Sequence, residues 1–523
     1  MRTDRWPAVA AAALAAACGG SDGPPPPPSG SFTLSGTVTY DSVPATGAGL
    51  DYLYTVEKPV RGAVVEVVTG NPAATLGSGT TGPLGEYSIT WTGTSAVAVR
   101  VKAQTLSPPM RVQDNTSQPQ PALYALDSGP VDASATTTLH LHAPSGWTGT
   151  SYGAPRAAAP FAILDAMVSA AAAFSAVRSP AFPELRLNWS VNNRPQGGDI
   201  SAGYIGTSHY NLSTQQLYIL GQANADTDEY DSHVIVHEWG HYFEDRLSRA
   251  DSPGGPHAYG QQKDPRLAFS EGWGNALGAI ALYPNDVYAD TMGPGQAGGF
   301  QFSVESNAAA DPVPGWYSEM SVAHFLYDLF DPASAPDGDG IALALGPIYD
   351  VMVGPQRTTP AFTTLFSFVD ALKRARPGDA SAIDSMLSGR SIAAPVQDAW
   401  ATDETHDAGW AANLPVYRLP VIGGTVWVSL FGGYWPNDLQ QNRFLRFTGT
   451  GGTLTVAAGN SMVDVSLEVW SGGQMLRYVD AVMGPGVETA SLSTALDATN
   501  LAVVTGWETA GSPYSVPVSV RSP

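Results

Sequence analysis

The sequence has little cysteine, little charge and few basic residues, and each shortage excludes a class of protein. One Cys among 523 residues excludes an internal disulfide framework and a zinc cluster built from cysteines. Charged residues make up only 14%, and 25 Lys and Arg stand against 47 Asp and Glu, for a net charge of -22. No nucleic-acid partner is expected, because phosphate binding needs a basic surface. At 43% hydrophobic residues the chain can still bury sizeable cores, which excludes wholesale disorder.

The single cysteine ends a short apolar segment near the start of the chain. Residues 1–5 carry charge, residues 8–17 are almost purely Ala, Val and Leu, and Cys18 follows. About ten apolar residues are too few to span a membrane. The segment resembles a bacterial lipoprotein signal, which implies removal of residues 1–17 and a lipid anchor on Cys18 in the cell envelope, with the outer membrane favoured. An ordinary secretory signal with an incidental cysteine is the alternative.

Between residues 154 and 410 the hydrophobic pattern predicts an α+β block. Helices are expected at residues 160–177, 231–248, 267–282, 317–330 and 360–375. Strands are expected at residues 185–189 and 216–220. The second of these strands is a candidate for an edge strand on which an extended peptide could pair, with an ordinary sheet strand as the alternative.

The second predicted helix contains the motif H-E-x-x-H, as His237-Glu238-Trp-Gly-His241. Residues four apart on a helix project from one face, so His237 and His241 can bind the same zinc ion. Glu238 stands beside them, where a carboxylate can act as the base that activates a water. An ordinary surface helix is the alternative, and the rarity of the motif argues against it.

A catalytic zinc ion keeps three protein ligands and one open position, so a third ligand is needed. A third histidine two turns further along is absent, because Leu247 stands there. Glu271 lies at the head of an apolar helical run rich in small residues, and a carboxylate there is costly unless it is paired or bound to metal. We therefore predict Glu271 as the third ligand. Glu244, Asp245 and Asp264 are the alternatives, and the first two look solvated.

These motifs resemble the gluzincin zinc metallopeptidases, which are thermolysin-like, and are most similar to the fungalysin group. The residues that carry the resemblance are 237–241, 246–248, 254–256, 270–275 and 318–330. The resemblance implies one catalytic zinc ion and peptide or protein substrates. Two departures matter. The gap of 29 residues between His241 and Glu271 is longer than in these relatives. Asn275 stands where they place an Asp that orients a zinc-bound histidine.

Gluzincin-like enzymes also need a donor for the negative charge that develops on the peptide oxygen, often a Tyr or a His. The candidates are Tyr317 and His324, both within the helix predicted at 317–330. A packed helix position is the alternative for His324.

A calcium ion is the other cofactor that the sequence brings into question. Asp337-Gly-Asp339-Gly offers carboxylate oxygens. The segment lacks the twelve-residue spacing and the closing Glu of a calcium loop, which favours a solvated turn.

Two β-rich blocks flank the α+β block. Residues 31–145 contain β-branched runs such as 60–68 between Gly and Pro turns, and resemble the carboxypeptidase regulatory-like β-sandwich. Residues 416–523 contain similar runs, such as 425–430, and resemble the β-sandwiches that follow bacterial secreted peptidases. Five consecutive Pro in residues 18–30 are typical of a stiff linker.

These patterns predict a multidomain protein in which an α+β zincin-type metallopeptidase core is flanked by N- and C-terminal β-sandwich domains. The expected divisions are a signal at 1–17, a linker at 18–30, a sandwich at 31–145, the core at 154–410 and a sandwich at 416–523. The expected function is zinc-dependent hydrolysis of peptide bonds by a secreted, lipid-anchored metalloendopeptidase. The alternative is a surface-binding lipoprotein, such as an adhesin, with a degenerate or scaffold-only core. The presence of both histidines and both glutamates argues against it.

Overall fold

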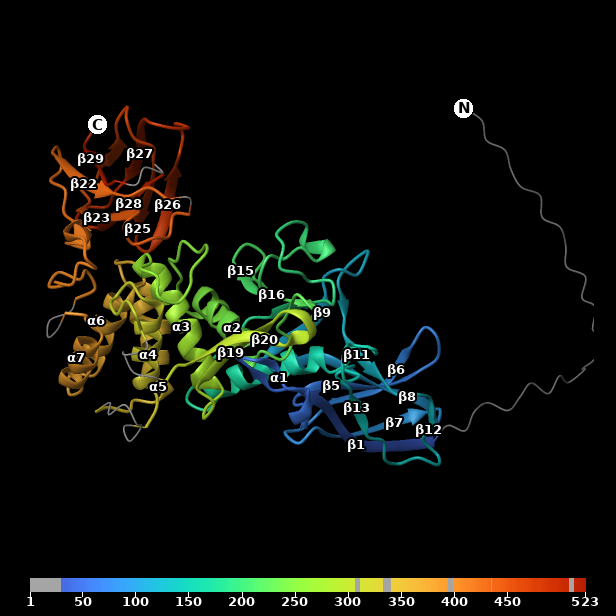
Figure 1. The fold of residues 1–523 in the computed structure, drawn as a ribbon. Helices are drawn as coiled ribbons and strands as arrows, with labels where there is room; N and C mark the ends of the chain where they lie inside the picture. Colours follow the sequence, from blue (N-terminus) through green and yellow to red (C-terminus); the bar gives the residue numbers. More distant parts are fainter. Residues whose placement is uncertain (1–29, 306–310, 333–339, 394–397, 434, 508–511) are drawn as a thin grey trace, which may run out of the picture.

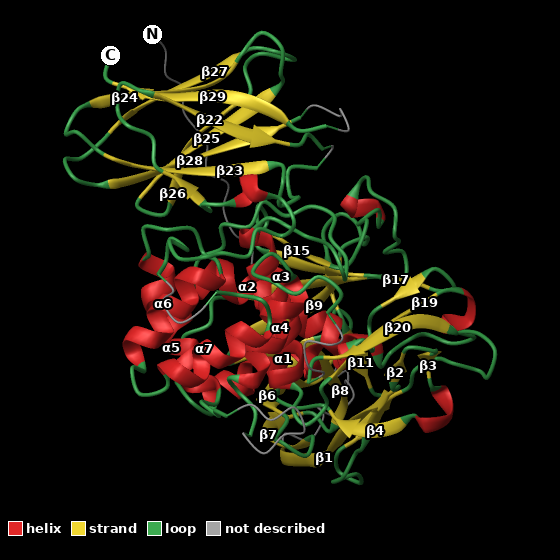
Figure 2. Ribbon diagram, turned by 60° about the vertical axis from the view of Figure 1, so that its left-hand side comes forward, coloured by secondary structure: helices red, strands yellow, loops and turns green. Residues whose placement is uncertain are grey.

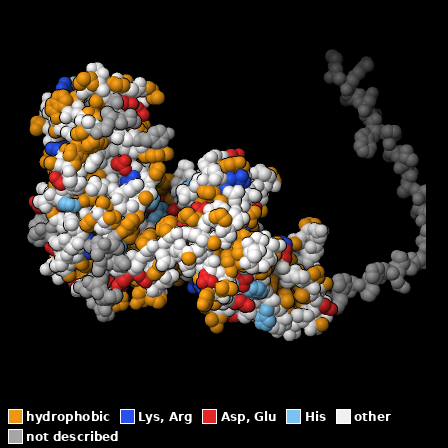
Figure 3. Space-filling model, viewed as in Figure 1, with side chains coloured by type: hydrophobic (Ala, Val, Ile, Leu, Met, Phe, Trp, Pro, Cys, Tyr) orange, Lys and Arg blue, Asp and Glu red, His pale blue; other side chains and the backbone are white. Residues whose placement is uncertain are grey.

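A computed structural model of the chain describes residues 30–305, 311–332, 340–393, 398–433, 435–507 and 512–523. In these ranges the chain runs from an N-terminal β part through a helical centre to a C-terminal β domain (Figure 1; Figure 2). The surface is indented between the N-terminal part and the rest of the molecule (Figure 3). The predicted signal, Cys18, and the loop with Asp337 and Asp339 lie outside the described residues.

Two large sheets and one two-stranded sheet make up the N-terminal β part. The strands of the first are β1 (Gly30–Ser42), β4 (Val56–Pro59), β7 (Glu86–Gly93) and β13 (Leu141–Ala143). β1 pairs with each of the other three. A separate two-stranded sheet consists of β2 (Ala45–Thr46) and β3 (Gly49–Leu50). β7 alternates between exposed and buried residues, as a strand with one face on a core does.

The second sheet has ten strands. Its main path, in spatial order, is β15 (His209–Asn211), β16 (Gln216–Ile219), β14 (Leu185–Trp189), β9 (Pro109–Asp114), β8 (Ala96–Leu106), β5 (Ala63–Thr69) and β6 (Ala74–Thr80). Three short strands pair with β8 or β9 beside this path, namely β10 (Ala122–Leu123), β11 (Ala125–Asp127) and β12 (Val131–Asp132).

This sheet crosses the domain boundary that the sequence predicts between residues 145 and 154. β9, before the boundary, pairs in parallel with β14, after it. β14 then pairs in parallel with β16, and β15 pairs antiparallel with the outer side of β16. The N-terminal block and the predicted core therefore share one sheet and one hydrophobic core. The expectation for residues 216–220 is corrected: they form an interior strand, and the edge of the sheet is β15.

Seven α-helices occur in the described residues: α1 (Ala159–Ser175), α2 (Ser232–Leu247), α3 (Pro265–Ala281), α4 (Glu319–Asp328), α5 (Leu345–Val351), α6 (Leu365–Ala375) and α7 (Ala380–Gly389). α3 is buried along almost its whole length and packs between α2 and α4. α1 covers the large sheet and contacts α2. None of these helices combines the length and the apolar composition that a membrane span requires.

A small antiparallel sheet lies beside the start of α2. Its strands are β17 (Gly221–Gln222), β18 (Asp226–Thr227), β19 (Val287–Met292) and β20 (Gly298–Ser303). The buried carboxylate of Asp231, the residue before α2, accepts hydrogen bonds from the backbone N–H and the hydroxyl of Thr291 in β19. This sheet thereby holds the N-terminus of α2.

The C-terminal block consists of two sheets packed face to face. The first has the order β21 (Tyr417–Arg418), β23 (Asn442–Thr448), β28 (Thr499–Gly506), β25 (Val465–Ser471) and β26 (Gln474–Val479). The second has the order β22 (Thr425–Leu430), β29 (Tyr514–Arg521), β24 (Thr453–Gly459) and β27 (Val487–Ser493). Inward residues of both sheets, such as Leu445 and Val456, form a hydrophobic core separate from the main one. The predicted C-terminal β-sandwich is confirmed at this level.

Side chains join this sandwich to the helical centre. Phe362 packs edge-on against Phe444 and Trp470 of the sandwich, and these residues belong to the main hydrophobic core. Arg266 at the start of α3 is buried and pairs with Asp264 at 2.9 Å and with Glu468 of the sandwich at 3.3 Å. The contact is therefore both apolar and charge-paired.

Candidate metal centre and active site

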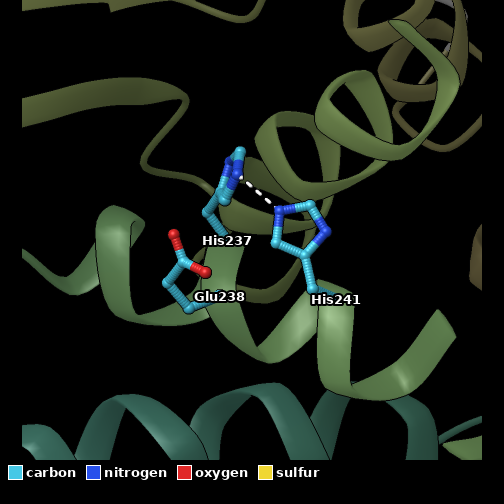
Figure 4. A group of neighbouring side chains, drawn as sticks. All are labelled: His237, Glu238 and His241. Atoms are coloured by element: carbon cyan, nitrogen blue, oxygen red, sulfur yellow. Dashed lines mark hydrogen bonds between the residues drawn. The ribbon is translucent and has the colours of Figure 1, made fainter. Parts of the chain in front are cut away.

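The H-E-x-x-H motif lies in the middle of α2, and the helix presents its two histidines on one face. The Nε2 atoms of His237 and His241 are 3.1 Å apart, and Glu238 lies beside them (Figure 4). His237 and Glu238 are buried, and the side chain of His241 is 18% exposed. Solvent therefore reaches the histidine pair mainly through the partly exposed side chain of His241.

Glu271 comes to the same point from α3. Its Oε2 atom is 3.1 Å from Nε2 of His237 and 3.5 Å from Nε2 of His241. The approach requires a glycine on α3, because a Cβ atom at Gly274 would lie 2.8 Å from the His237 ring. On α2 a Cβ atom at Gly240 would lie 3.2 Å from the Cα atom of Gly274. The small residues of the motif region are therefore what lets the two helices bring their ligands together.

The spacing of the three donor atoms fits a tetrahedral zinc site. Zinc binds imidazole nitrogen and carboxylate oxygen at about 2.0–2.2 Å, so two ligands of a tetrahedron stand about 3.4 Å apart. The observed separations of 3.1, 3.1 and 3.5 Å lie close to that value. Two neutral imidazoles and one carboxylate are also a donor set that zinc accepts. The residues present therefore fit a zinc ion.

Charge is concentrated at this point. Burial alone would raise the pKa of Glu271, but the positive charges of His241 and His257 hold it well below its usual range. Burial alone would lower the pKa of His241, but the carboxylates of Glu271 and Glu244 hold it well above its usual value. A metal cation would replace the proton on His241 and meet the same carboxylate.

Each histidine is oriented through its other ring nitrogen. Nδ1 of His237 is 2.9 Å from Oδ1 of Asn275 on α3, so it carries the proton and leaves Nε2 free to bind metal. Nδ1 of His241 is 3.2 Å from Oγ of Ser270, which itself donates a hydrogen bond to Glu244. Asn275 therefore occupies the orienting position that the sequence predicts for it.

The alternative ligands lie elsewhere. Glu244 is 1% exposed, so its interpretation as a solvated residue is wrong, and it supports His241 through Ser270. Asp245 accepts a hydrogen bond from the hydroxyl of Tyr210. The carboxylate of Asp264 accepts hydrogen bonds from the backbone N–H and the guanidinium of Arg266 at the start of α3.

Glu238 is held by the edge strand of the large sheet. The backbone N–H of Tyr210 in β15 donates a hydrogen bond of 2.8 Å to its Oε2 atom. This hydrogen bond fixes the carboxylate of Glu238 beside the histidine pair, and α2 fixes the backbone of the same residue. The edge strand and the candidate base are therefore neighbours.

His257 is a functional candidate that the sequence does not single out. Its Nδ1 atom is 2.8 Å from Oε2 of Glu319, and its Nε2 atom is 3.2 Å from Oε2 of Glu271. Burial alone would lower its pKa, but the two carboxylates raise the pKa of His257 to about 9. Its side chain is 31% exposed, so it can meet a ligand. In the sequence, only Gly254 and Gly255 before it indicate a turn. In the structure both glycines have positive φ.

Tyr317 and His324 are not brought to this group. The Tyr317 hydroxyl is 3.2 Å from the carbonyl oxygen of Pro314 and 3.2 Å from Nδ1 of His406. His324 is fully buried, and burial together with the charge of Arg390 lowers its pKa to about 4. The site-facing residue of α4 is Glu319; at about 100° per residue, His324 lies about 140° further around the helix.

A second group of acidic side chains lies beside the start of α2. Asp226, Asp228 and Asp290 each offer an oxygen atom within 4.8 Å of the others. Burial raises the pKa of all three, and repulsion from neighbouring carboxylates raises each of them further, that of Asp290 to about 7. The hydroxyl of Ser208 donates a hydrogen bond to Asp228. The sequence does not reveal this group, because pairing of β18 with β19 brings the residues together.

Comparison with known proteins assigns no family. No family model matches the chain, and no curated protein matches it. Among solved structures, the pre-peptidase C-terminal domain of a collagenase from Bacillus anthracis is 13% identical and covers 20% of this chain and 93% of that one, with a TM-score of 0.16. CorA, a surface-associated copper-binding protein of Methylomicrobium album BG8, is 9% identical and covers 20% of this chain and 98% of that one, with a TM-score of 0.17. With TM-scores this low, neither bears on function.

Proposed function

We propose that the protein is a zinc-dependent metallopeptidase of the gluzincin type that hydrolyses peptide bonds, with a zincin-type core between the β parts. One observation carries the proposal. Nε2 of His237, Nε2 of His241 and Oε2 of Glu271, from two helices, are spaced as three ligands of one tetrahedral zinc ion. A buried carboxylate, Glu238, offers an oxygen atom within 4.8 Å of ligand atoms of both histidines, and we assign it the role of base rather than ligand.

His237, His241 and Glu271 would hold the zinc ion, and Asn275 and Ser270 would keep the two imidazoles in orientation. When bound, the ion supplies Lewis acidity that polarises a peptide carbonyl and makes water more acidic. Glu238 takes a proton from the attacking water and delivers it to the leaving amine.

His257 is the group that we assign to the developing negative charge on the peptide oxygen. It is the partly exposed donor nearest to Glu271, and Glu319 holds its far side at 2.8 Å. A positively charged imidazole in a fixed place can stabilise an oxyanion without reorganising. This role replaces the one expected of Tyr317 and His324.

The edge strand β15 offers a place for the substrate backbone. It pairs with β16 on one side, and its Tyr210 contacts the candidate base. An extended peptide on the outer side of β15 would lie beside Glu238. At Tyr210 it would pair with the backbone carbonyl, because the N–H of Tyr210 donates to Glu238. Such pairing uses main-chain hydrogen bonds, which suits a peptidase that accepts many sequences.

Metal analysis of the purified protein, joined to a peptidase assay, tests the proposal. We expect about one zinc per chain, hydrolysis of a mixed peptide library, loss of hydrolysis in a chelator and its return with zinc. A chain that binds zinc tightly but cleaves no peptide would contradict the proposal and favour the surface-binding alternative. A chain that binds no zinc would contradict it at the first step.

We also propose that the protein is anchored to the cell envelope through a lipid on Cys18. The proposal depends on the apolar segment that Cys18 ends and on its being the only thiol. Cys18→Ser should move the protein from the membrane fraction to the soluble fraction or leave its signal uncleaved. Unchanged membrane partitioning with full cleavage would contradict the anchor.

A further inference from the structure

We infer that the C-terminal β domain completes the active site, with Asn437 as a positioning residue that holds the loop of His257 against Glu271. The inference depends on the proposed function only for the chemical role of His257. The contacts themselves stand without it.

Asn437 reaches from the C-terminal domain to the loop that precedes His257. It lies between β22 and β23 and is 1% exposed. Its Nδ2 atom donates to the backbone carbonyls of Gly254 at 3.0 Å and Pro256 at 2.9 Å. Both donors of the amide are thereby used on the two carbonyls that flank Gly255, directly before His257.

The loop is shaped to accept this contact. Gly254 and Gly255 have φ values of 64° and 92°, in the region that favours glycine. A Cβ atom on Gly255 would lie 2.9 Å from Nδ2 of Asn437, so any larger residue would displace the amide. The close approach of side chain and loop backbone therefore depends on both partners.

The same segment of the C-terminal domain also fastens the start of α3. The backbone N–H of Asp264 donates to the backbone carbonyl of Asn437 at 2.8 Å, and Nδ2 of Asn442 donates to Oδ2 of Asp264 at 2.7 Å. Asp264 begins α3, which carries Glu271 two turns later. One segment thus sets the place of both His257 and Glu271, whose side chains meet at 3.2 Å.

A side chain that only strengthened the domain contact would have a different effect. It would lower stability and activity together, whether or not His257 were present. A residue that positions His257 should change activity only while His257 is there to be positioned. The two roles are therefore separated by a double-mutant cycle.

The test uses Asn437→Asp, which keeps the shape of the side chain but replaces both N–H donors by oxygen. Asn437→Ala is a second variant that adds no charge. Asp438→Asn is the matched control, because Asp438 is 57% exposed and pairs with Lys263 rather than with the loop. All variants in the full chain must unfold cooperatively before they are compared.

Hydrogen exchange in the metal-free protein gives the first readout. We expect the backbone amides of the non-proline residues in 252–258 to exchange at least tenfold faster in Asn437→Asp or Asn437→Ala, and at an unchanged rate in Asp438→Asn. Equal exchange in all four proteins would overturn the inference. Because this readout needs neither zinc nor turnover, its failure is distinguishable from failure of the proposed function.

Turnover of a peptide with zinc bound gives the second readout. We expect Asn437→Ala to lower kcat roughly tenfold with zinc content unchanged. In a His257→Ala background the same change should alter kcat less than about twofold. An equal loss in both backgrounds would show that Asn437 does not act through His257 and would overturn the inference.

Discussion

The two β parts of the molecule meet the candidate site in different ways. The N-terminal part joins the helical centre through backbone pairing, because β9 and β14 are neighbours in one sheet. The C-terminal domain joins it through side chains and one short backbone bridge between Lys263 and Asp438, and it has a separate core of its own. The sheet that the first part shares with the centre reaches Glu238 through β15, and the second part reaches His257 through Asn437. Both look like appended sandwiches in the sequence, but only the second has a hydrophobic core of its own beside the residues that it adds to the main core.

The largest expected effect comes from removing residues 30–145. This deletion takes away β5, β8 and β9, and leaves β14 with an unpaired, apolar edge. We expect the rest of the α+β block to lose cooperative folding and metal binding, because the sheet and its core are shared. Circular dichroism during thermal unfolding and zinc titration measure both.

Residues 416–523 alone are the control for this deletion. They contain both sheets of the sandwich and its separate core, so they should fold by themselves with one cooperative transition. A chain without residues 30–145 that still binds zinc and unfolds cooperatively would break the comparison.

The next largest effect is expected from two substitutions that distinguish the proposed ligand Glu271 on α3 from the proposed base Glu238 beside β15. Glu271→Ala removes one of three donor atoms, so zinc affinity and activity should both fall steeply. Glu238→Gln keeps the three donors, so zinc content should stay near one per chain while turnover falls by roughly two to four powers of ten. Metal analysis and single-turnover assays compare the two. Equal zinc retention in both variants would place the third ligand elsewhere.

A smaller effect is expected at the contact between α2 and α3, in the centre of the molecule. In Gly274→Ala the new methyl group would lie 2.8 Å from the His237 ring, which must shift away from its metal-binding position. We expect zinc affinity to fall roughly 10- to 100-fold. Gly278→Ala is the matched control, because its nearest new contact is an ordinary 3.5 Å from His233. Similar zinc affinities in a competition titration would contradict the tight-packing account.

The smallest effect concerns pH and the acidic group beside α2, on the N-terminal side of the site. The pKa of Asp290 is raised to about 7, so the folded state favours the protonated form and stability falls as pH rises from about 4 to about 7. Asp290→Asn should therefore raise the unfolding temperature in chelator by several degrees at pH 8 and leave it nearly unchanged at pH 4. Equal effects at both pH values would contradict the raised pKa.

Local periodicity in the sequence was enough to predict the elements that carry the candidate ligands. The helices at 231–248 and 267–282 occur at 232–247 and 265–281, because apolar spacing acts within a few turns. His237 and His241 share a face for the same reason, since a helix fixes the direction of residues four apart. Glu271 stood out because a carboxylate in an apolar helix needs a partner.

Only the tertiary structure decided which surfaces of those elements meet. The parallel pairing of β9 with β14 joined two blocks that the sequence predicts as separate, because strand pairing between distant segments leaves no local pattern. Tyr317 and His324 had suitable chemistry, but packing of α4 turned Glu319 to the site instead.

His257 and Asn437 show the same limit most clearly. Gly254 and Asn437 are 183 positions apart, and their hydrogen bond exists because two independently patterned segments pack together. The sequence by itself determined the donor types and their spacing along each helix, since these depend on neighbours in the chain. Only the tertiary structure decided which other side chains these donor atoms contact. Long-range packing selects one face and one strand register among the many that the local pattern allows.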